Sequence, residues 1–307
     1  MFEDLPVASP CKCCGKPLSP FYPAVQDPQT REVFRLDRCD VCDHVQTEPQ
    51  PVDLGPYYGD RYHGGRHGIM ETICMSRRLR FTNSVARRGS LLDFGCGDGG
   101  FLARAQSEGW DVTGVEVKPE HARARGLRIR ESLDEVEGAF DVITLWHSLE
   151  HVKDPRETLA RLTRLLKDDG VVLIAVPNRT GLQARLFGPG WFHLDPPRHL
   201  GHFSPASLSG LLSRAGLEIV RRWNLEFEID LFGWTQSALN RIIRVPNVLF
   251  DVVTHRGRPH SASDVVLSLL AGSVVTALCL PFVLYTAAVG DGGIMIVAAR
   301  RREATAA

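Results

Sequence analysis

The most constraining feature of this sequence is a glycine-rich segment, residues 93–100, which reads Asp-Phe-Gly-Cys-Gly-Asp-Gly-Gly. An apolar run, residues 90–92, comes before it, and the helix-like run Phe-Leu-Ala-Arg-Ala follows it. This order predicts a buried strand, a tight turn and the start of a helix. Glycines permit a positive φ and let a ligand lie against the main chain, and the free amides of a helix start face that ligand. The segment therefore predicts an α/β fold that binds a ligand at this turn.

A second predicted strand, residues 110–115, ends in Glu116, whose carboxylate can accept two hydrogen bonds from ribose hydroxyls. The glycine-rich segment resembles motif I of class I S-adenosylmethionine (SAM)-dependent methyltransferases, whose loop is typically Asp-x-Gly-x-Gly-x-Gly. A dinucleotide site is the rival interpretation, because it also uses a glycine-rich turn and an acidic residue after the second strand. However, this loop has no clean third glycine at the dinucleotide spacing.

The region after the next predicted strand, residues 140–146, separates the two interpretations. Its pattern Leu149-Glu150-His151-Val152-x-Asp154-Pro155 resembles the segment after strand 4 in the superfamily that includes the ubiquinone-pathway O-methyltransferases. Asp154 is a predicted N-cap of a helix whose apolar spacing continues until Gly170 stops it, and a buried strand is predicted over residues 171–176. We therefore interpret the chain as a SAM-dependent methyltransferase.

This resemblance covers about residues 50–302 and implies a doubly wound α/β sheet of seven strands with an antiparallel last strand. It also implies a set of SAM-binding residues. These are Asp93, Gly95, Cys96 and Gly97 for the methionine part, Glu116 for the ribose, Ser132 and Leu133 for the adenine, and Trp146, with His147, beside the sulfonium.

Two histidine clusters are candidates for removing a proton from a hydroxyl acceptor, since methyl transfer otherwise needs mainly alignment. The first contains His147, Glu150 and His151, which share one face if this turn is helical. In the ubiquinone O-methyltransferases the similar place carries Glu-x2-Glu-His, thought to hold a divalent ion. Here His147 replaces the first carboxylate, which disfavours Mg²⁺ because a hard ion prefers oxygen ligands. General base, metal ligand and structural hydrogen bonding all remain open for this cluster.

The second cluster lies in the aromatic, histidine-rich run Trp191–Phe203. It resembles the Asp-x-Pro-Arg-His-x-x-x-Phe-Ser stretch of a broad group of bacterial class I methyltransferases. In a doubly wound sheet such a loop surrounds the ligand, so His199 is the second acid–base candidate. The alternative is a loop fixed by buried hydrogen bonds from histidine to backbone.

Paired cysteines near the start of the chain predict a zinc ribbon. Cys11-x2-Cys14 and Cys39-x2-Cys42 are separated by 24 residues, a spacing that can wrap one tetrahedral Zn²⁺. Four thiolates leave no position for water or substrate, so the predicted metal is structural. Cys13 is a spare thiol beside the first pair. Similar ribbons precede the catalytic domain in sugar C-methyltransferases and in a family of rRNA guanine methyltransferases.

A long apolar segment precedes the predicted final strand. Residues 265–289 include no charged side chain and are long enough for a membrane-spanning helix. Because the final strand must return to the same sheet, we instead expect two short apolar helices, broken at Gly272 and Pro281, that enter one leaflet or line an acceptor tunnel. Nearby arginines could meet anionic headgroups, namely Arg241, Arg244, Arg256 and Arg258. A buried or dimer-forming helical pair is the alternative.

The expected domains are a zinc ribbon (1–48), a linker and lid helix (49–88), the SAM-binding core (89–235), the helical apolar insert (236–290) and the final core strand (291–302). Tyr58 and Tyr62 belong to the expected lid, or to a packed aromatic hinge. Thirty-six basic residues balance thirty-six acidic ones, which makes nucleic acid an unlikely partner. The N-terminus lacks the features of a signal peptide, so we expect a cytoplasmic protein, peripheral on the inner membrane leaflet.

The predicted activity is methyl transfer from SAM to a small-molecule acceptor, such as a lipid or a lipid-linked sugar. Two alternatives remain: an rRNA methyltransferase that grips RNA with its ribbon, and a non-catalytic adaptor with the same fold. The base-methylating Asn/Asp-Pro-Pro-aromatic motif is missing after residue 146, which disfavours methylation of a flipped base.

Overall fold

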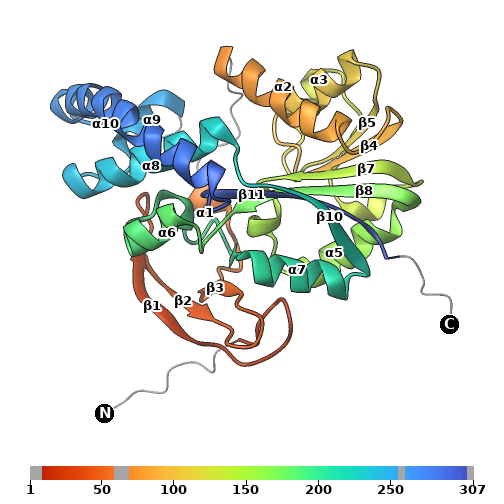
Figure 1. Ribbon diagram of the computed structural model, residues 1–307, viewed down its shortest axis with the longest axis horizontal. Coiled ribbons are helices and arrows are strands. Elements are labelled where there is room, and N and C mark those ends of the chain that lie inside the picture. The colour runs from red at the N-terminus through yellow and green to blue at the C-terminus, as the bar shows by residue number, and fades with distance from the viewer. Residues whose placement is uncertain (1–8, 59–68, 255–259, 303–307) are drawn as a thin grey trace.

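The computed structural model describes residues 9–58, 69–254 and 260–302, and its centre is a seven-stranded sheet in the order β10-β11-β8-β7-β4-β5-β6 (Figure 1). Strands β4 to β8 pair in parallel, and β11 runs antiparallel to both of its neighbours, β8 and β10. The predicted doubly wound sheet with an antiparallel last strand is therefore confirmed. The strands are β4 (Ser90–Phe94), β5 (Asp111–Val115), β6 (Ile129–Arg130), β7 (Phe140–Trp146), β8 (Leu166–Pro177), β10 (Leu217–Trp223) and β11 (Ile294–Arg301).

Helices cover both faces of this sheet (Figure 1). One face carries α2 (Ile69–Asn83) and α3 (Gly100–Ser107), and the other carries α5 (Pro155–Arg164) and α7 (Pro205–Arg214). Each face buries its own apolar cluster, which fits strands that read as continuous apolar runs. Shorter helical segments of this core are α4 (Glu120–Ala124), α6 (Leu182–Phe187) and the 3₁₀ turns at Leu133–Glu135, Leu149–His151, Gly188–Gly190 and Phe192–Leu194.

The start of α5 matches the sequence prediction, but its end does not. The Asp154 side chain accepts a hydrogen bond from the Glu157 amide at 2.9 Å, and Pro155 occupies the first turn. The helix ends at Arg164, not at Gly170, because Leu166 already pairs with Phe140 at the start of β8. Gly170 therefore lies inside a strand that is longer than the predicted one.

The N-terminal region forms a second, four-stranded sheet in the order β1-β2-β3-β9. Strands β1 (Ser19–Gln26), β2 (Val33–Arg38) and β3 (Val45–Glu48) form an antiparallel meander, and the one-turn helix α1 (Gly55–Tyr58) follows. The fourth strand, β9 (Gly201–His202), comes from the histidine-rich loop, through the pairs Val45↔His202 and Gln46↔Gly201. The N-terminal sheet is thus continuous with a loop of the α/β core.

The apolar insert differs from the prediction. After α8 (Phe227–Ile242) and α9 (Val248–Thr254), one helix, α10 (Ala262–Ala288), runs without interruption through Gly272 and Pro281, so the expected pair of short helices is wrong. Gly272 lies against Leu249 of α9, where a side chain would obstruct the contact between the two helices. Pro281 is exposed, so the amide that proline lacks would not have formed a buried hydrogen bond. By length and composition α10 is able to cross a membrane, with a mean hydropathy of 2.2 over its most apolar window.

Two further expectations concern a domain boundary and three individual side chains. The expected boundary at residue 235 falls inside α8, which joins the core to the insert. Tyr62, Arg256 and Arg258 lie outside the described residues.

Candidate active site

The glycine-rich turn between β4 and α3 has the backbone geometry that its sequence requires. Gly95, Gly97 and Gly99 have φ values of +73°, +58° and +78°, which residues with a Cβ rarely adopt. The amides of Gly95 and Cys96 donate to the Val115 carbonyl at 2.8 and 3.1 Å. A Cβ added to Gly97 would meet no atom within 4 Å among the described residues. The turn is therefore held to the sheet on one side and is open in front of Gly97.

The carboxyl ends of the parallel strands bring the other predicted SAM-binding residues to the same edge. Glu116 follows β5, and its Oε2 accepts the Gly97 amide at 2.9 Å. Ser132 and Leu133 follow β6, where the Ser132 hydroxyl caps a 3₁₀ turn by accepting the Asp134 amide. Main-chain amides, a carboxylate and a half-buried turn thus border one region, as a nucleoside ligand requires.

Two of the predicted residues are packed beneath this region. Asp93 is buried below the turn, where burial raises the pKa of its carboxyl to about 7 and the Thr144 hydroxyl donates to it at 2.6 Å. Trp146 lies between Phe101, at 5.7 Å between ring centroids, and the guanidinium of Arg78, at 5.1 Å from the ring. Its indole N–H is buried and has no hydrogen-bond partner among the described residues.

A buried chain of charges, which the sequence did not reveal, leads from Arg78 to the first histidine cluster. Arg78 Nε donates to Glu226 Oε1 at 2.8 Å, and Glu226 Oε2 lies 2.6 Å from His147 Nε2. The other ring nitrogen of His147 lies 3.4 Å from Glu150 Oε1. Burial opposes the charge on His147, but the two carboxylates overcome it and raise its pKa to about 9. His147 is therefore a partly buried cation between two buried acids.

Arg78 and Glu226 could not be found from the sequence because no local pattern marks them. They are 148 residues apart, on α2 and immediately before α8. Burial would raise the pKa of Glu226, but Arg78 and His147 hold it well below its usual range.

His151 and His199 form a second, neighbouring arrangement. His151 Nδ1 lies 2.8 Å from the Arg198 carbonyl, and His199 Nδ1 lies 2.8 Å from the His193 carbonyl. A carbonyl only accepts hydrogen bonds, so both rings carry a proton on Nδ1. The two rings are 4.7 Å apart, and burial together with His199 lowers the pKa of His151 to about 4. His151 is therefore neutral near pH 7.

Glu150 completes this arrangement with a carboxylate that is almost fully buried. Burial would raise its pKa, but the close contact with His147 and the charge of that residue lower that pKa to about 2. Neither carboxylate oxygen has a hydrogen-bond partner within the described ranges. A buried, ionised carboxylate in this state is suited to a donor from a ligand.

The ligand atoms of Glu150, His151 and His199 lie within 4.8 Å of one another, so this set could also hold a metal ion. Both rings have their second nitrogen bound to a carbonyl, as histidine ligands usually do. Two imidazoles and one carboxylate suit a transition metal and disfavour Mg²⁺. The set contains His199 where the sequence suggested His147.

The N-terminal sheet holds the loop that carries His199. The Thr47 hydroxyl donates to the His199 carbonyl at 2.7 Å, and the Thr47 amide donates to the Leu200 carbonyl. Arg198 forms a buried ion pair with Asp27 at 2.9 Å, a second pair with Asp195, and a hydrogen bond to the Tyr57 carbonyl. The Tyr58 hydroxyl lies 3.1 Å from His151 Nδ1, so this expected lid residue reaches the candidate active site.

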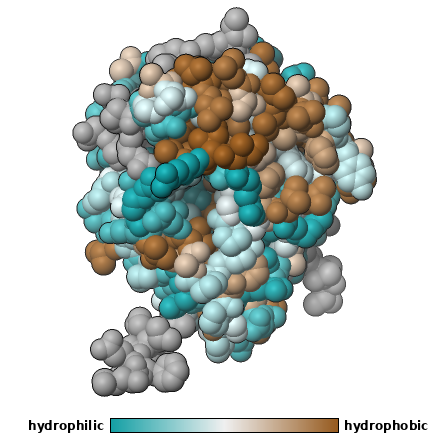
Figure 2. All heavy atoms as spheres, turned by 90° about the vertical axis from the view of Figure 1, so that its left-hand side faces the viewer, coloured by the Kyte–Doolittle hydropathy of each residue, from teal (hydrophilic) through white to brown (hydrophobic). Residues whose placement is uncertain are grey.

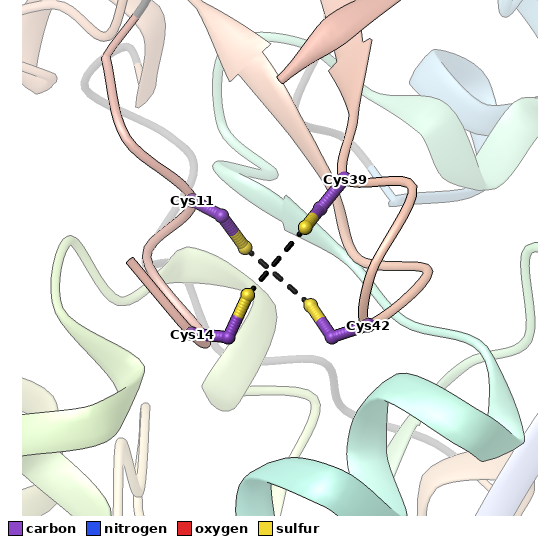
Figure 3. A group of neighbouring side chains, drawn as sticks. All are labelled: Cys11, Cys14, Cys39 and Cys42. Carbon is purple, nitrogen blue, oxygen red and sulfur yellow. Dashed lines mark hydrogen bonds between the residues drawn. The ribbon is translucent and has the colours of Figure 1, made fainter. Parts of the chain in front are cut away.

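Four cysteine sulfurs meet at the other end of the same sheet (Figure 3). The Sγ atoms of Cys11 and Cys42 are 3.5 Å apart, and those of Cys14 and Cys39 are 3.4 Å apart. A tetrahedral zinc ion with Zn–S bonds of about 2.3 Å would place its sulfurs about 3.8 Å apart, close to these distances. Cys11 and Cys14 lie on one turn, and Cys39 and Cys42 lie on another. In each turn the amide of a later residue donates to the carbonyl of the first cysteine. Cys13 is buried outside the group.

Known proteins with similar sequences define the class. A family model described as a methyltransferase domain matches residues 66–222. The ubiquinone biosynthesis O-methyltransferase of Thiobacillus denitrificans is 29% identical over 191 residues, which cover 55% of this chain and 78% of that protein. The protein of the same name from Methylococcus capsulatus is 30% identical over 203 residues, covering 61% and 77%. Among solved structures, the CcbJ methyltransferase from Streptomyces caelestis aligns with a TM-score of 0.46 and 13% identity, covering 80% of this chain and 96% of that one.

The sheet order, the glycine-rich turn and the family match define a class I methyltransferase. The chain belongs to the methyltransferase-domain family and is a SAM-dependent methyltransferase, as the sequence predicted.

Proposed function

We propose that the enzyme transfers the methyl group of SAM to a hydroxyl oxygen of a small apolar acceptor, a lipid or a lipid-linked molecule. The observation that carries this proposal is the neutral His151 beside the ionised carboxylate of Glu150, whose oxygens accept no hydrogen bond from the described residues. The two relatives named above, both O-methyltransferases of ubiquinone biosynthesis, support oxygen as the acceptor atom.

SAM would lie across the glycine-rich turn. In this assignment the main chain of Gly95, Cys96 and Gly97 faces the methionine part, Glu116 exchanges its bond with the Gly97 amide for bonds to the ribose, and Ser132 with Leu133 borders the adenine. Asp93 and Trp146 would support the SAM site from beneath the turn, because both side chains are buried under this region. Bound SAM supplies an electrophilic methyl group on a sulfonium.

The chain's own residues would align the acceptor and take its proton. The acceptor oxygen attacks the methyl carbon in line with the breaking C–S bond, S-adenosylhomocysteine leaves, and the hydroxyl proton passes to His151 Nε2. The hydrogen bond from Nδ1 to the Arg198 carbonyl fixes the tautomer needed for this transfer. Glu150 accepts a hydrogen bond from the acceptor, and His147 holds Glu150 in place as a positioning residue.

We further propose that Cys11, Cys14, Cys39 and Cys42 hold one structural zinc ion. The donor set consists only of thiols, and the sulfur separations are close to those of a tetrahedral site. Its chemistry here would be structural: it would cross-link the two cysteine turns and so order β3, on which the His199 loop is paired.

The test is incubation of the purified chain with SAM labelled in its methyl group and a bacterial membrane extract. We expect label in the lipid fraction and, for His151→Gln, a turnover at least about a hundredfold lower with unchanged affinity for S-adenosylhomocysteine. His121→Gln, on the exposed surface of α4, is the matched control and should retain full activity. Label that enters only RNA, the alternative substrate, would refute the proposal, as would an active His151→Gln variant.

A further inference from the structure

Helix α10 turns its large apolar side chains away from the protein. Exposed members include Leu267, Leu269, Leu270, Val274, Leu278 and Phe282. Successive residues of a helix are about 100° apart around its axis. Viewed down that axis, the exposed apolar residues of α10 cover an arc of about 220°, with Leu269 at one edge and Phe282 at the other. Figure 2 shows the result as a broad hydrophobic area over this part of the molecule. Only 17% of the most apolar window of α10 is buried.

The inward face of α10 is built mainly from small side chains. Ser268, Gly272, Cys279, Val283 and Thr286 are buried along it. The hydroxyl groups of Thr276 and Thr235 lie 3.1 Å apart and join α10 to α8. The contact of α10 with α8 is thus made by small residues and hydroxyl groups, whereas its large aliphatic residues lie on the outside.

The width of the apolar arc favours a lipid phase over a second copy of the chain. A helix that packs on one partner needs an apolar stripe of about 100°, and a coiled-coil seam is narrower still. The arc on α10 is about twice as wide as that stripe, so one partner surface would leave much of it in water. A bilayer surface is continuous and covers more of the arc than a single partner helix does.

The charges around α10 also fit an anionic surface. Arg241 and Arg244, at the end of α8, are exposed, and Arg241 also donates to the Phe187 carbonyl. Among the described residues near α10, Asp251 lies 2.8 Å from His260 and Asp291 pairs with Arg185, whereas Asp264 accepts a hydrogen bond from the neutral Ser261 hydroxyl and keeps its charge. In this part of the described chain the two exposed arginines therefore outnumber the one acid that lacks a cationic partner.

We propose that α10 docks the enzyme in the plane of an anionic bilayer, with its apolar face in the boundary between headgroups and acyl chains. Crossing the bilayer is disfavoured, because β11 begins six residues after α10 and returns to the central sheet. In addition, the end of α8 would have to carry Arg241, and Arg244 two residues beyond the helix, into the hydrocarbon. A helix of 27 residues is about 40 Å long and offers this contact over its full length. The inference rests on the proposed function only in assigning a lipid acceptor.

The test is flotation of the full chain with vesicles of phosphatidylglycerol and phosphatidylcholine, without SAM or acceptor. We expect the wild type to float with the mixed vesicles, more weakly at about 0.5 M NaCl. L270Q/V274Q/L278Q, at positions 68%, 61% and 65% exposed, should lower vesicle affinity at least about tenfold without changing the thermal unfolding midpoint. The matched control, V33Q/V52Q/V220Q, replaces three exposed valines elsewhere and should float like the wild type.

Depth measurements test the in-plane arrangement. Bimane attached to L270C, L278C or L284C should be quenched equally by lipids brominated near the headgroup, whereas graded quenching would contradict the proposal. Failure of the wild type to float would overturn it, as would a dimer that the triple variant dissociates in the absence of vesicles. Calorimetry with S-adenosylhomocysteine on the same samples keeps this result separate from the proposed methyl transfer, because it reports SAM-site binding without lipid.

Discussion

The ion pair between Arg198 and Asp27 is the most stringent test of the link between the N-terminal sheet and the active site. Both side chains are almost fully buried, at 2% and 0% exposed, and they join at 2.9 Å. Arg198→Ala leaves the Asp27 charge without its cation and also removes the contacts to Asp195 and the Tyr57 carbonyl. Removing one partner of a buried pair costs about 3–5 kcal/mol. Because Thr30 still donates two hydrogen bonds to Asp27, we expect about 3 kcal/mol.

The free energy of unfolding in urea measures this cost. Arg185→Ala is the matched control, because Arg185 pairs with Asp291 at a similar distance, 2.7 Å, but is 54% exposed. Exposed pairs contribute at most about 1 kcal/mol. Arg198→Ala should also lower turnover while S-adenosylhomocysteine binds as before, since the glycine-rich turn lies outside this network. If the two variants unfold within about 1 kcal/mol of each other, the N-terminal sheet does not hold the loop in the way we describe.

The remaining predictions concern the cysteine group and the partly buried His147. The wild type should contain one zinc per chain by mass spectrometry of the metal; Cys39→Ser should lose the metal and melt at a lower temperature, whereas Cys13→Ser, outside the group, should retain it. Equal metal content in all three would exclude the assigned ligands. The pKa of His147 is about 9 in the folded chain and 6.5 ordinarily, so its stabilisation is complete below pH 6.5 and is lost as the pH rises through 9. That difference is worth about 3 kcal/mol, so the stability advantage of the wild type over His147→Gln should fall by about this amount between these limits, and a pH-independent advantage would contradict the pairing.

The sequence revealed those features that local physics determines. The turn at Gly95, Gly97 and Gly99 needs left-handed backbone, which few residues other than glycine adopt, so its pattern identified both the turn and its place after a strand. The start of α5 was equally visible, because an N-cap and a first-turn proline act within four residues.

Features that depend on contacts between distant segments could not be predicted. Strand β9 is two residues long and exists only because β3 lies beside it. Arg78 and Glu226 become neighbours only when α2 packs across the sheet, so neither could be associated with His147. The continuity of α10 has the same origin, since α8 and α9 pack along its small-residue face.

The interpretation of the histidines changed for a related reason. From the sequence, His147, His151 and His199 were equivalent candidates for acid–base work. In the structure His147 faces carboxylates on both sides, whereas His151 is fixed by a carbonyl on one side only. The difference depends on Glu226, which lies 79 residues further along the chain.

The most direct test of the central claim is a calorimetric titration of S-adenosylhomocysteine into the purified chain and two glycine variants. Gly97→Ala and Gly138→Ala impose the same kind of backbone strain, with φ of +58° and +91° and no described atom within 4 Å of the added Cβ. Gly138 precedes β7, at the opposite edge of the sheet from the glycine-rich turn. We predict one ligand per chain for the wild type and for Gly138→Ala, and binding at least about tenfold weaker for Gly97→Ala. No binding to the folded wild type, or equal binding to all three chains, would contradict the account.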